Sequence, residues 1–270
     1  MAALIVFLPV RLLLYWQYMS ADASDLARIK GVQRKARQGE SGERRKEYTR
    51  RYRQVLEHIF EEIRQEIRPY IDSPQEGISC RKGCTHCCEH FVSVSVSHAL
   101  LIADYLYASN KAMSAFLRGY SRWICAIEDN PQASAVFSSL EEHTTSAAIV
   151  NPYSQELLSA YHAFAVPCPF LDADQCSIYP VRPVCCAAYF AVSPPDYCRA
   201  DSDTLATIFE VAPSQANLRR MAELTDPRLS LHQEPLPKLV YKLLTQGLPD
   251  VVLEVENLFR SQGPDALKHL

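Results

Sequence analysis

Glycine is scarce in this sequence, and neither sign of charge is in strong excess. The chain has only eight glycines, and none forms the G-x-G-x-x-G pattern of a dinucleotide- or S-adenosylmethionine-type loop. The formal net charge of −3 gives no reason to expect nucleic acid as the partner. These absences argue against a Rossmann-type methyltransferase and against a nucleic-acid-binding protein.

A long hydrophobic run without charge is also missing. The segment from Met1 to Met19 is apolar, but Arg11 interrupts it and no basic residue precedes it. It is therefore short and charged for a spanning helix, and it lacks the basic start of a signal peptide. We interpret it as a terminal helix, or as residues upstream of a true start at Met19. We expect a cytoplasmic protein without stable membrane insertion, in which thiols stay reduced.

Hydrophobic periodicity predicts a mainly α fold. The clearest helix covers residues 48–67, where apolar side chains recur at three- and four-residue steps and Pro69 follows the predicted end. Alternation at residues 92–96 predicts a short strand, after which Ser97 is positioned to cap a helix. Further helices are predicted at residues 111–128, 134–149, 153–163, 203–211, 213–223, 236–246 and 248–260.

One segment departs from this helical pattern. Residues 166–200 hold six prolines and five cysteines, so a long helix is improbable there and another constraint, such as a metal, is expected. We divide the chain into an N-terminal apolar segment and basic linker (1–42), a helical cysteine-cluster metal-binding domain (43–200) and a C-terminal helical extension that packs on it (201–270).

Ten cysteines all fall between Cys80 and Cys198, and only Cys125 lies apart from two clusters. Cys125 sits in an apolar helical run and reads as a core residue. In a reducing compartment, the clustering of the other nine favours a metal over disulfides.

The first cluster has the spacing Cys-x3-Cys-x2-Cys-Cys at Cys80, Cys84, Cys87 and Cys88. A helix that starts just after Gly83 would place the last three thiols on one face. Gly83 would allow the tight turn before it, and Cys80 would approach from the preceding loop. The neighbouring histidines, His86 and His90, could be zinc ligands. We favour their interpretation as surface residues or as groups that support the ligands.

The second cluster consists of loop cysteines spaced so that they can converge on one centre: Cys168, Cys176, Cys185, Cys186 and Cys198. Zinc takes four ligands and a four-iron cluster takes four thiolates. Nine clustered thiols exceed either requirement, so there are two centres, or some thiols have redox or supporting roles. The adjacent pairs at 87–88 and 185–186 favour a larger cluster or two sites, and we favour iron–sulfur over zinc.

Together, the two motifs resemble the YkgJ-type cysteine-cluster proteins, a family also described as zinc- or iron-chelating, with flagellin lysine N-methylase as a distant member. The second motif is Cys-Pro-Phe-Leu-x4-Cys-x-Ile-Tyr-x2-Arg-Pro-x2-Cys, and the resemblance covers about residues 78–200. It implies chelating positions at Cys80, Cys84, Cys87, Cys88, Cys168, Cys176, Cys186 and Cys198. Ala187 replaces a frequent arginine of the family and Cys185 is an extra thiol, whereas Arg182 remains and could pair with Asp172 or Asp174.

The leading hypothesis is a metal- or iron–sulfur-binding protein, with a 4Fe-4S cluster or zinc held for redox chemistry or for folding. The alternative is a protein-lysine methyltransferase-like enzyme related to the flagellin methylase. A third hypothesis is a thiol–disulfide protein of the cell envelope, for which Cys84 and Cys87 have the C-x-x-C spacing but lack a βαβ context. The sequence does not identify the protein partner or substrate.

Overall fold

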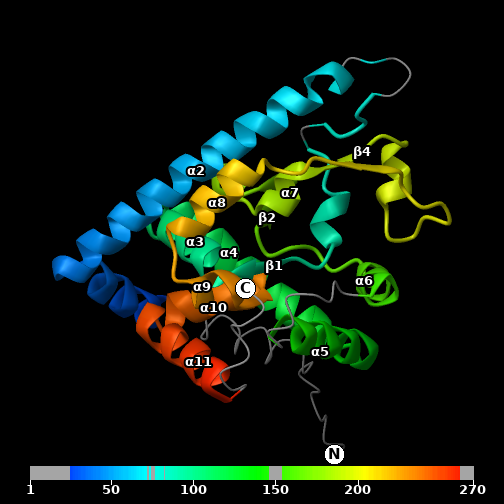
Figure 1. Cartoon of the computed structure of the whole chain (residues 1–270). Coiled ribbons are helices and arrows are strands. Elements are labelled where there is room, and N and C mark those ends of the chain that lie inside the picture. The colour runs from blue at the N-terminus through cyan, green and yellow to red at the C-terminus, as the bar shows by residue number, and fades with distance from the viewer. Residues whose placement is uncertain (1–24, 72, 74–76, 82, 146–153, 262–270) are drawn as a thin grey trace, which may run out of the picture.

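The computed structural model describes residues 25–71, 73, 77–81, 83–145 and 154–261. The predicted mainly α fold is confirmed, because helices form most of the described chain and the strands are short (Figure 1). The apolar segment at residues 1–19 lies outside the described residues. Within them, no helix combines the length and apolar character needed to span a membrane.

The longest element is α2 (Gly39–Ile71), which runs along one side of the molecule (Figure 1). Residues 25–37 form a helix before it, and the chain bends at Gln38. The two helices are thus separated by a single bend, next to which Gly39 has a φ of +65°. The predicted end of the helix before Pro69 is wrong, because the helix continues to Ile71 and tolerates proline in its last turn.

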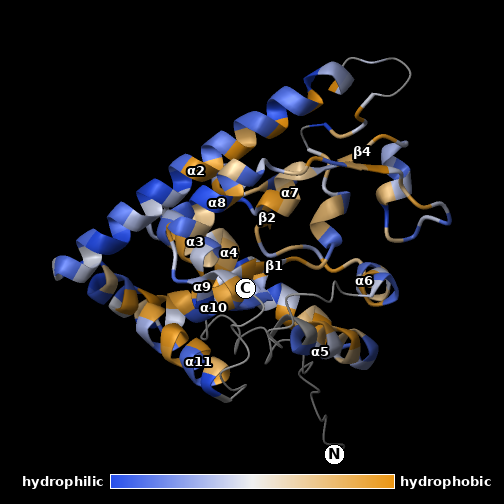
Figure 2. Cartoon of the chain, in the orientation of Figure 1, coloured by the Kyte–Doolittle hydropathy of each residue, from blue (hydrophilic) through white to orange (hydrophobic). Residues whose placement is uncertain are grey.

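The two faces of α2 follow the sequence pattern. Its buried face presents Tyr52, Leu56 and Ile59 toward α3 (Val96–Tyr107), α7 (Val184–Ala188) and α8 (Gln215–Glu223). Its outer face carries exposed Glu–Arg pairs three residues apart, which stabilise a helix only slightly (Figure 2).

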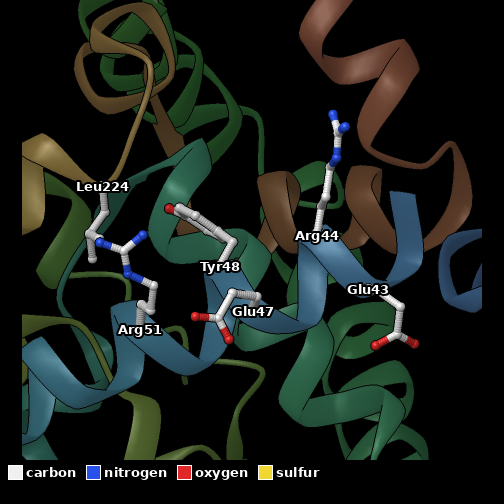
Figure 3. A pocket seen from close by; sticks show the side chains of 6 residues that line it. All are labelled: Glu43, Arg44, Glu47, Tyr48, Arg51 and Leu224. Carbon is white, nitrogen blue, oxygen red and sulfur yellow. The ribbon is translucent and has the colours of Figure 1, made fainter. Parts of the chain in front are cut away.

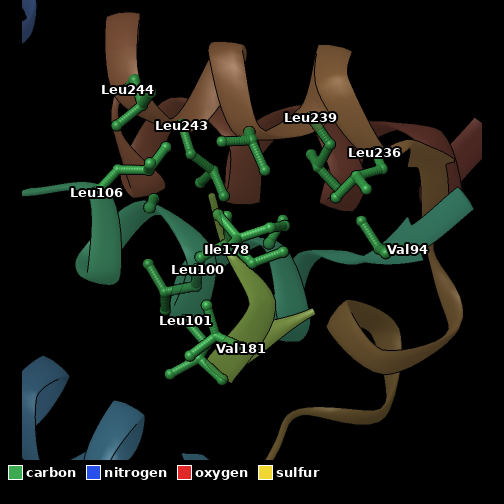
Figure 4. Close-up of a cluster of buried hydrophobic side chains, with 14 of the residues drawn as sticks. Val94, Leu100, Leu101, Leu106, Ile178, Val181, Leu236, Leu239, Leu243 and Leu244 are labelled. Atoms are coloured by element: carbon green, nitrogen blue, oxygen red, sulfur yellow. The ribbon is translucent and has the colours of Figure 1, made fainter. Parts of the chain in front are cut away.

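The main core lies between α3 and α10 (Leu236–Thr245), which pack against each other (Figure 4). The predicted cap at Ser97 is wrong. Ser95 has extended backbone angles and its side chain accepts a hydrogen bond from the His98 amide, so the helix begins at Val96. Ser97 then lies inside the helix and is buried.

Two short strands join the segment after the first cysteines to the C-terminal third of the chain. The predicted strand forms as β1 (Ser93–Ser95), which pairs antiparallel with β6 (Gln233–Pro235). The Leu236 amide extends this pairing through a hydrogen bond of 2.8 Å to the carbonyl of Val92.

A buried ion network lies on β6. Glu234 is only 3% exposed and is 2.9 Å from both His232 Nε2 and Lys242 Nζ. Burial alone would raise the pKa of Glu234, but these two partners lower it. The carboxylate is therefore buried with its charge compensated.

A second, aromatic core lies among α4 (Asn110–Glu128), α5 (Pro131–Thr145) and α6 (Gln155–His162). Trp123 Nε1 donates a 3.0 Å hydrogen bond to the hydroxyl of Tyr161 within it. Gly119 on α4 lies directly against the main chain of Pro169, because a Cβ there would be 2.2 Å from the Pro169 carbonyl oxygen.

The proline- and cysteine-rich segment is built from short pieces, as its composition indicated. These pieces are β2 (Leu171–Asp172), β3 (Gln175–Cys176), η2 (Tyr179–Val181), α7, β4 (Tyr189–Ala191) and η3 (Pro195–Cys198). The helix predicted at residues 203–211 is wrong, because β5 (Ile208–Glu210) pairs with β4 there. The remaining C-terminal helices are α8, α9 (Pro227–Leu231), which was not predicted, and α11 (Leu248–Ser261).

Candidate metal centre

The first cysteine segment, residues 80–88, is a turn followed by the 3-10 helix η1 (His86–Glu89). Gly83 has a φ of +91°, which supports its predicted role in the turn. The predicted helix start just after Gly83 is wrong, because Thr85 has a φ of −124° and is not helical. Cys84 therefore precedes the helix, and only the last two cysteines of the segment lie on it.

Cys168 and Cys176 belong to one tight hairpin. The Leu171 amide donates a 2.9 Å hydrogen bond to the Cys168 carbonyl, and Leu171 lies opposite Cys176 across β2 and β3. Ala173 and Asp174 both have positive φ values, which reverse the chain between these strands. The eight-residue spacing of the two cysteines thus corresponds to a hairpin that holds both near its base.

The last three cysteines lie on two short helices. Cys185 and Cys186 are in the first turn of α7, and Cys198 is the final residue of η3. Cys185 is exposed, whereas Cys186 and Cys198 are partly buried. None of the nine clustered cysteines forms a disulfide.

Three contacts bring the two segments together around η1. The Cys168 amide donates a 2.7 Å hydrogen bond to the Cys88 carbonyl. The Ala191 amide on β4 donates a 3.2 Å hydrogen bond to Cys80 Sγ, and η3 packs against η1. In Figure 1 the teal segment after α2 accordingly runs between the yellow β4 region and α6. The two cysteine segments therefore approach each other through backbone contacts, whereas their convergence on one centre stays a prediction.

The thiols interact electrostatically as well. A hydrogen bond from the Cys88 thiol lowers the pKa of Cys87 to about 7, so Cys87 is the most readily ionised of this pair. Burial, or a hydrogen bond with the adjacent cysteine, raises the pKa of six other cysteines, and the charge of Cys87 raises each of them further. They are Cys80, Cys88, Cys168 (to about 12), Cys176, Cys186 and Cys198 (to about 11).

His90, beside the first cysteine cluster, contacts two other rings. His90 stacks on His162 with ring centroids 4.1 Å apart and meets the edge of Tyr189 at 5.8 Å. Burial, and then the nearby His162, lowers the pKa of His90 to about 4, so the His90 ring is neutral near pH 7. The interpretation of His86 and His90 as supporting groups stays a prediction.

Arg182 is a site residue whose role the sequence did not reveal. Its guanidinium carbon lies 3.8 Å from the centroid of the Tyr179 ring. Among the described residues it forms no ion pair with Asp172 or Asp174, which the sequence suggested as partners. Within the described residues, the buried Nε of Arg182 also has no hydrogen-bond partner. The Arg-Pro motif of the sequence drew attention to Arg182. Its stacking on the Tyr179 ring, however, depends on how the chain turns at η2.

The positive charge of Arg182 reaches two of the thiols. After the hydrogen bond from Cys88, it is a further cause of the lowered pKa of Cys87. It also opposes the effect of burial, which raises the pKa of Cys176. A cation beside a group of thiols favours their ionised forms, which are the forms that bind metals.

Tyr189 is a second site residue that periodicity could not identify. Burial raises its pKa, and the charges of Cys198, Cys87 and Cys80 contribute to the shift. Tyr189 begins β4 directly after α7, and its ring contacts that of His90. Cys125, which was expected in the core, lies on α4 and is partly buried.

Two hollows occur in the part of the chain that the structure describes, and one of them borders a cysteine. The larger is an open groove of about 410 Å³ that contains no cysteine (Figure 3), and its lining residues are Glu43, Arg44, Glu47, Tyr48, Arg51 and Leu224. The smaller, of about 20 Å³, is lined by His90, Trp123, Tyr161 and Cys168, among others. Its volume suits about one water molecule. Neither hollow provides a substrate-sized pocket over the thiols.

The donor set fits zinc or iron by its chemistry. Both zinc and iron–sulfur clusters take thiolate ligands, and the two segments carry nine free thiols. In the part of the chain that the structure describes, no three His, Cys, Asp or Glu side chains have an arrangement that could hold one metal ion. The backbone therefore collects donors of the right type, while their side chains are not arranged for coordination.

Comparison with known proteins supports the same chemistry. Residues 79–208 match the CxxCxxCC family model, described as "Putative zinc- or iron-chelating domain". No curated protein and no solved structure matches the chain. The match contains every cysteine of the chain and confirms the resemblance stated from the two motifs. Residues 79–208, just under half of the chain, are therefore similar to the zinc- or iron-chelating domains of this cysteine-cluster family.

Proposed function

We propose that this protein binds an inorganic centre through cysteine thiolates and that the centre is an iron–sulfur cluster with a redox role. The proposed ligands are Cys80, Cys84, Cys87, Cys88, Cys168, Cys176, Cys186 and Cys198. The observation that carries the proposal is the position of η1, which is held to Cys168 through the Cys88 carbonyl and lies against η3. Backbone segments whose cysteines are 80 residues apart (Cys88 and Cys168) and 110 residues apart (Cys88 and Cys198) thus meet at η1.

The number and surroundings of the thiols support iron–sulfur over zinc. Nine clustered thiols are more than twice the four that a single zinc needs. The hydrogen bond from the Ala191 amide to Cys80 Sγ is of the kind that tunes cluster potentials. Arg182 would partly offset the negative charge of the thiolates around Cys87.

When bound, such a cluster supplies one-electron transfer, and the residues of this chain hold and shield it. Side-chain rotation at the cysteines would have to bring the sulfurs into coordination. Binding would also stabilise the segment at residues 166–200, because metal binding and folding are coupled where the regular structure is short.

Anaerobic purification of the full chain tests the proposal through its absorption spectrum and its iron, zinc and sulfide contents. Broad visible absorbance with matching iron and sulfide is the expected result. A colourless protein with stoichiometric zinc would refute the iron–sulfur assignment but keep chelation, and a protein without either metal would refute chelation.

A pair of variants tests the ligands. Cys87→Ser should lose metal, because Cys87 lies on η1, which the second segment contacts through Cys168 and η3. Cys125→Ser is the matched control, since it removes a thiol from α4 and should keep the full metal content. Equal metal contents in the two variants would remove Cys87 from the ligands.

A further inference from the structure

We propose that the helix at residues 25–37 binds the surface of a membrane that contains anionic phospholipids. Its contact surface is the basic stripe, which consists of Lys30, Arg34 and Arg37. In Figure 1 this dark-blue helix lies on the opposite side of the molecule from β4 and the teal segment after α2. The basic stripe is therefore separate from the candidate metal centre.

Helical spacing places the basic stripe on one face. Its three residues are four and three positions apart, so their side chains lie side by side, and all three are exposed. The opposite face of the helix packs on the main core, where Ile29 is only 1% exposed and Leu26 is partly buried. The helix therefore presents its cations outward and its apolar side chains inward.

Hydrogen bonds fix this helix on the rest of the protein. Arg28 Nε donates a 3.0 Å hydrogen bond to the carbonyl of Thr245, the last residue of α10. Gln33 Nε2 donates a bond of the same length to the carbonyl of Tyr107, the last residue of α3. The backbone under the basic stripe is thus already ordered, which lowers the entropic cost of binding.

The cations of the basic stripe differ from those of α2 in having no counter-charge. Exposed arginines on α2 are paired with glutamates nearby in the helix, as in Arg50 with Glu47. Within the described residues, none of the three cations of the basic stripe forms an ion pair. A positive face without an internal partner fits a negatively charged surface.

Positive charge is concentrated on this helix. Residues 25–37 contain five basic residues and one acidic residue, although the whole chain has a formal net charge of −3. The single acid, Asp25, accepts a 2.5 Å hydrogen bond from the hydroxyl of Tyr241 and lies outside the basic stripe. An anionic partner is therefore attracted to this helix and not to the protein as a whole.

The sequence around the helix favours lipid over nucleic acid. Residues 1–19, which precede it, contain four aromatic residues and a single charged one, Arg11. Attachment to a membrane surface strengthens with buried apolar area and with attraction to anionic lipid, and it requires no spanning helix. Single-stranded nucleic acid is bound through aromatic side chains on which bases stack, and residues 25–37 contain none.

Sedimentation of the full chain with vesicles tests the proposal. One set of vesicles contains equal parts of phosphatidylserine and phosphatidylcholine, and the other contains phosphatidylcholine alone. We expect binding to the anionic vesicles that weakens as the salt concentration rises, and much weaker binding to the neutral ones. Equal binding to both sets, or binding to the anionic set that does not respond to salt, would overturn the proposal.

A triple variant locates the contact surface. Each basic residue near an anionic membrane strengthens binding about fivefold, so Lys30→Gln, Arg34→Gln and Arg37→Gln together should weaken it about a hundredfold. The three side chains are exposed, so the circular dichroism of the variant should match that of the wild type. Unchanged vesicle binding in a folded triple variant would refute the role of the basic stripe.

The matched control removes the same charge from three exposed arginines of α2 that are paired with glutamates. These changes are Arg44→Gln, Arg50→Gln and Arg64→Gln. The control should bind anionic vesicles far more tightly than the triple variant. Equal losses would assign binding to net charge and not to this surface. A single-stranded RNA that displaces the protein from the vesicles and fails to bind the triple variant would identify nucleic acid as the partner and refute a lipid surface.

Discussion

Replacement of Gly119 by alanine should destabilise the protein and reduce its metal content, although alanine favours helices. Gly119 lies inside α4, where the main chain of Pro169 passes against it. An added Cβ would lie 2.2 Å from the Pro169 carbonyl oxygen and 2.9 Å from both its carbonyl carbon and its Cα. All three atoms belong to the backbone, so no side chain can rotate away.

The expected size of the effect follows from two opposing terms. Ordinary contacts begin near 3.4 Å, so α4 and Pro169 must separate by about 1 Å. Overpacking of this kind costs about 1–3 kcal/mol, whereas the Gly→Ala change in a helix gains up to about 1 kcal/mol. The free energy of unfolding should therefore fall by about 1–2 kcal/mol, which lowers the melting temperature by roughly 2–8 °C.

Urea unfolding measures the loss, and Gly31→Ala is the matched control. Gly31 lies in the helix at residues 25–37, and an added Cβ there meets nothing within 4 Å. Gly31→Ala should thus be neutral or stabilising. Gly119→Ala should also lower the metal content, because Pro169 directly follows the proposed ligand Cys168. Equal stability of the two variants would refute the reasoning about close packing at α4.

Three further predictions concern charged groups. Burial lowers the pKa of His98 to about 4, so stability should fall by about 3 kcal/mol as the pH drops from about 6.5 to 4, and His98→Gln should remove that dependence. Glu234→Gln should cost about 1–3 kcal/mol in urea unfolding, because His232 and Lys242 lose the buried carboxylate while Lys242 keeps its second partner, Glu254. Arg182→Gln should weaken metal affinity about tenfold in chelator competition, since about 1.4 kcal/mol of charge compensation is lost.

Exposed residues of α2 provide the controls for these changes. His58→Gln, Glu61→Gln and Arg64→Gln alter the same residue types at exposed positions and should have little effect. The predictions fail if His98→Gln keeps the wild-type pH slope or if Glu234→Gln costs no more than Glu61→Gln. Equal metal affinities of the Arg182 and Arg64 variants would contradict the third.

The elements predicted correctly are those that a pattern of neighbouring residues in the sequence specifies. The buried face of α2 appears where apolar residues recur at helical spacing, and β1 appears where valine and serine alternate. The predictions at Ser97 and at residues 203–211 failed for nonlocal reasons. The extended backbone of β1 moves the start of the helix to Val96, and pairing with β4 makes residues 208–210 a strand.

The candidate site was predictable in its chemistry but not in its geometry. Thiolate donors at the right spacing indicate a metal whatever the fold, and the family match supports that reading. The contact of Arg182 with Tyr179 and the placement of Tyr189 depend on how η2 and β4 turn. The domain boundaries, the ligand set, the cytoplasmic location and the methyltransferase-like alternative stay predictions.

The pairing of β1 with β6 has a consequence for synthesis on the ribosome. Ser93 and its hydrogen-bond partner Gln233 are 140 residues apart, so β1 waits for that stretch to be translated. At about 5–20 residues per second, the delay is on the order of ten seconds. Because Cys198 is translated 35 residues before Gln233, a nascent chain that already carries every cysteine lacks the strand partner just beyond η1 for about 2–7 seconds of that delay. Its thiols are open to oxidants or to a delivery factor during those seconds.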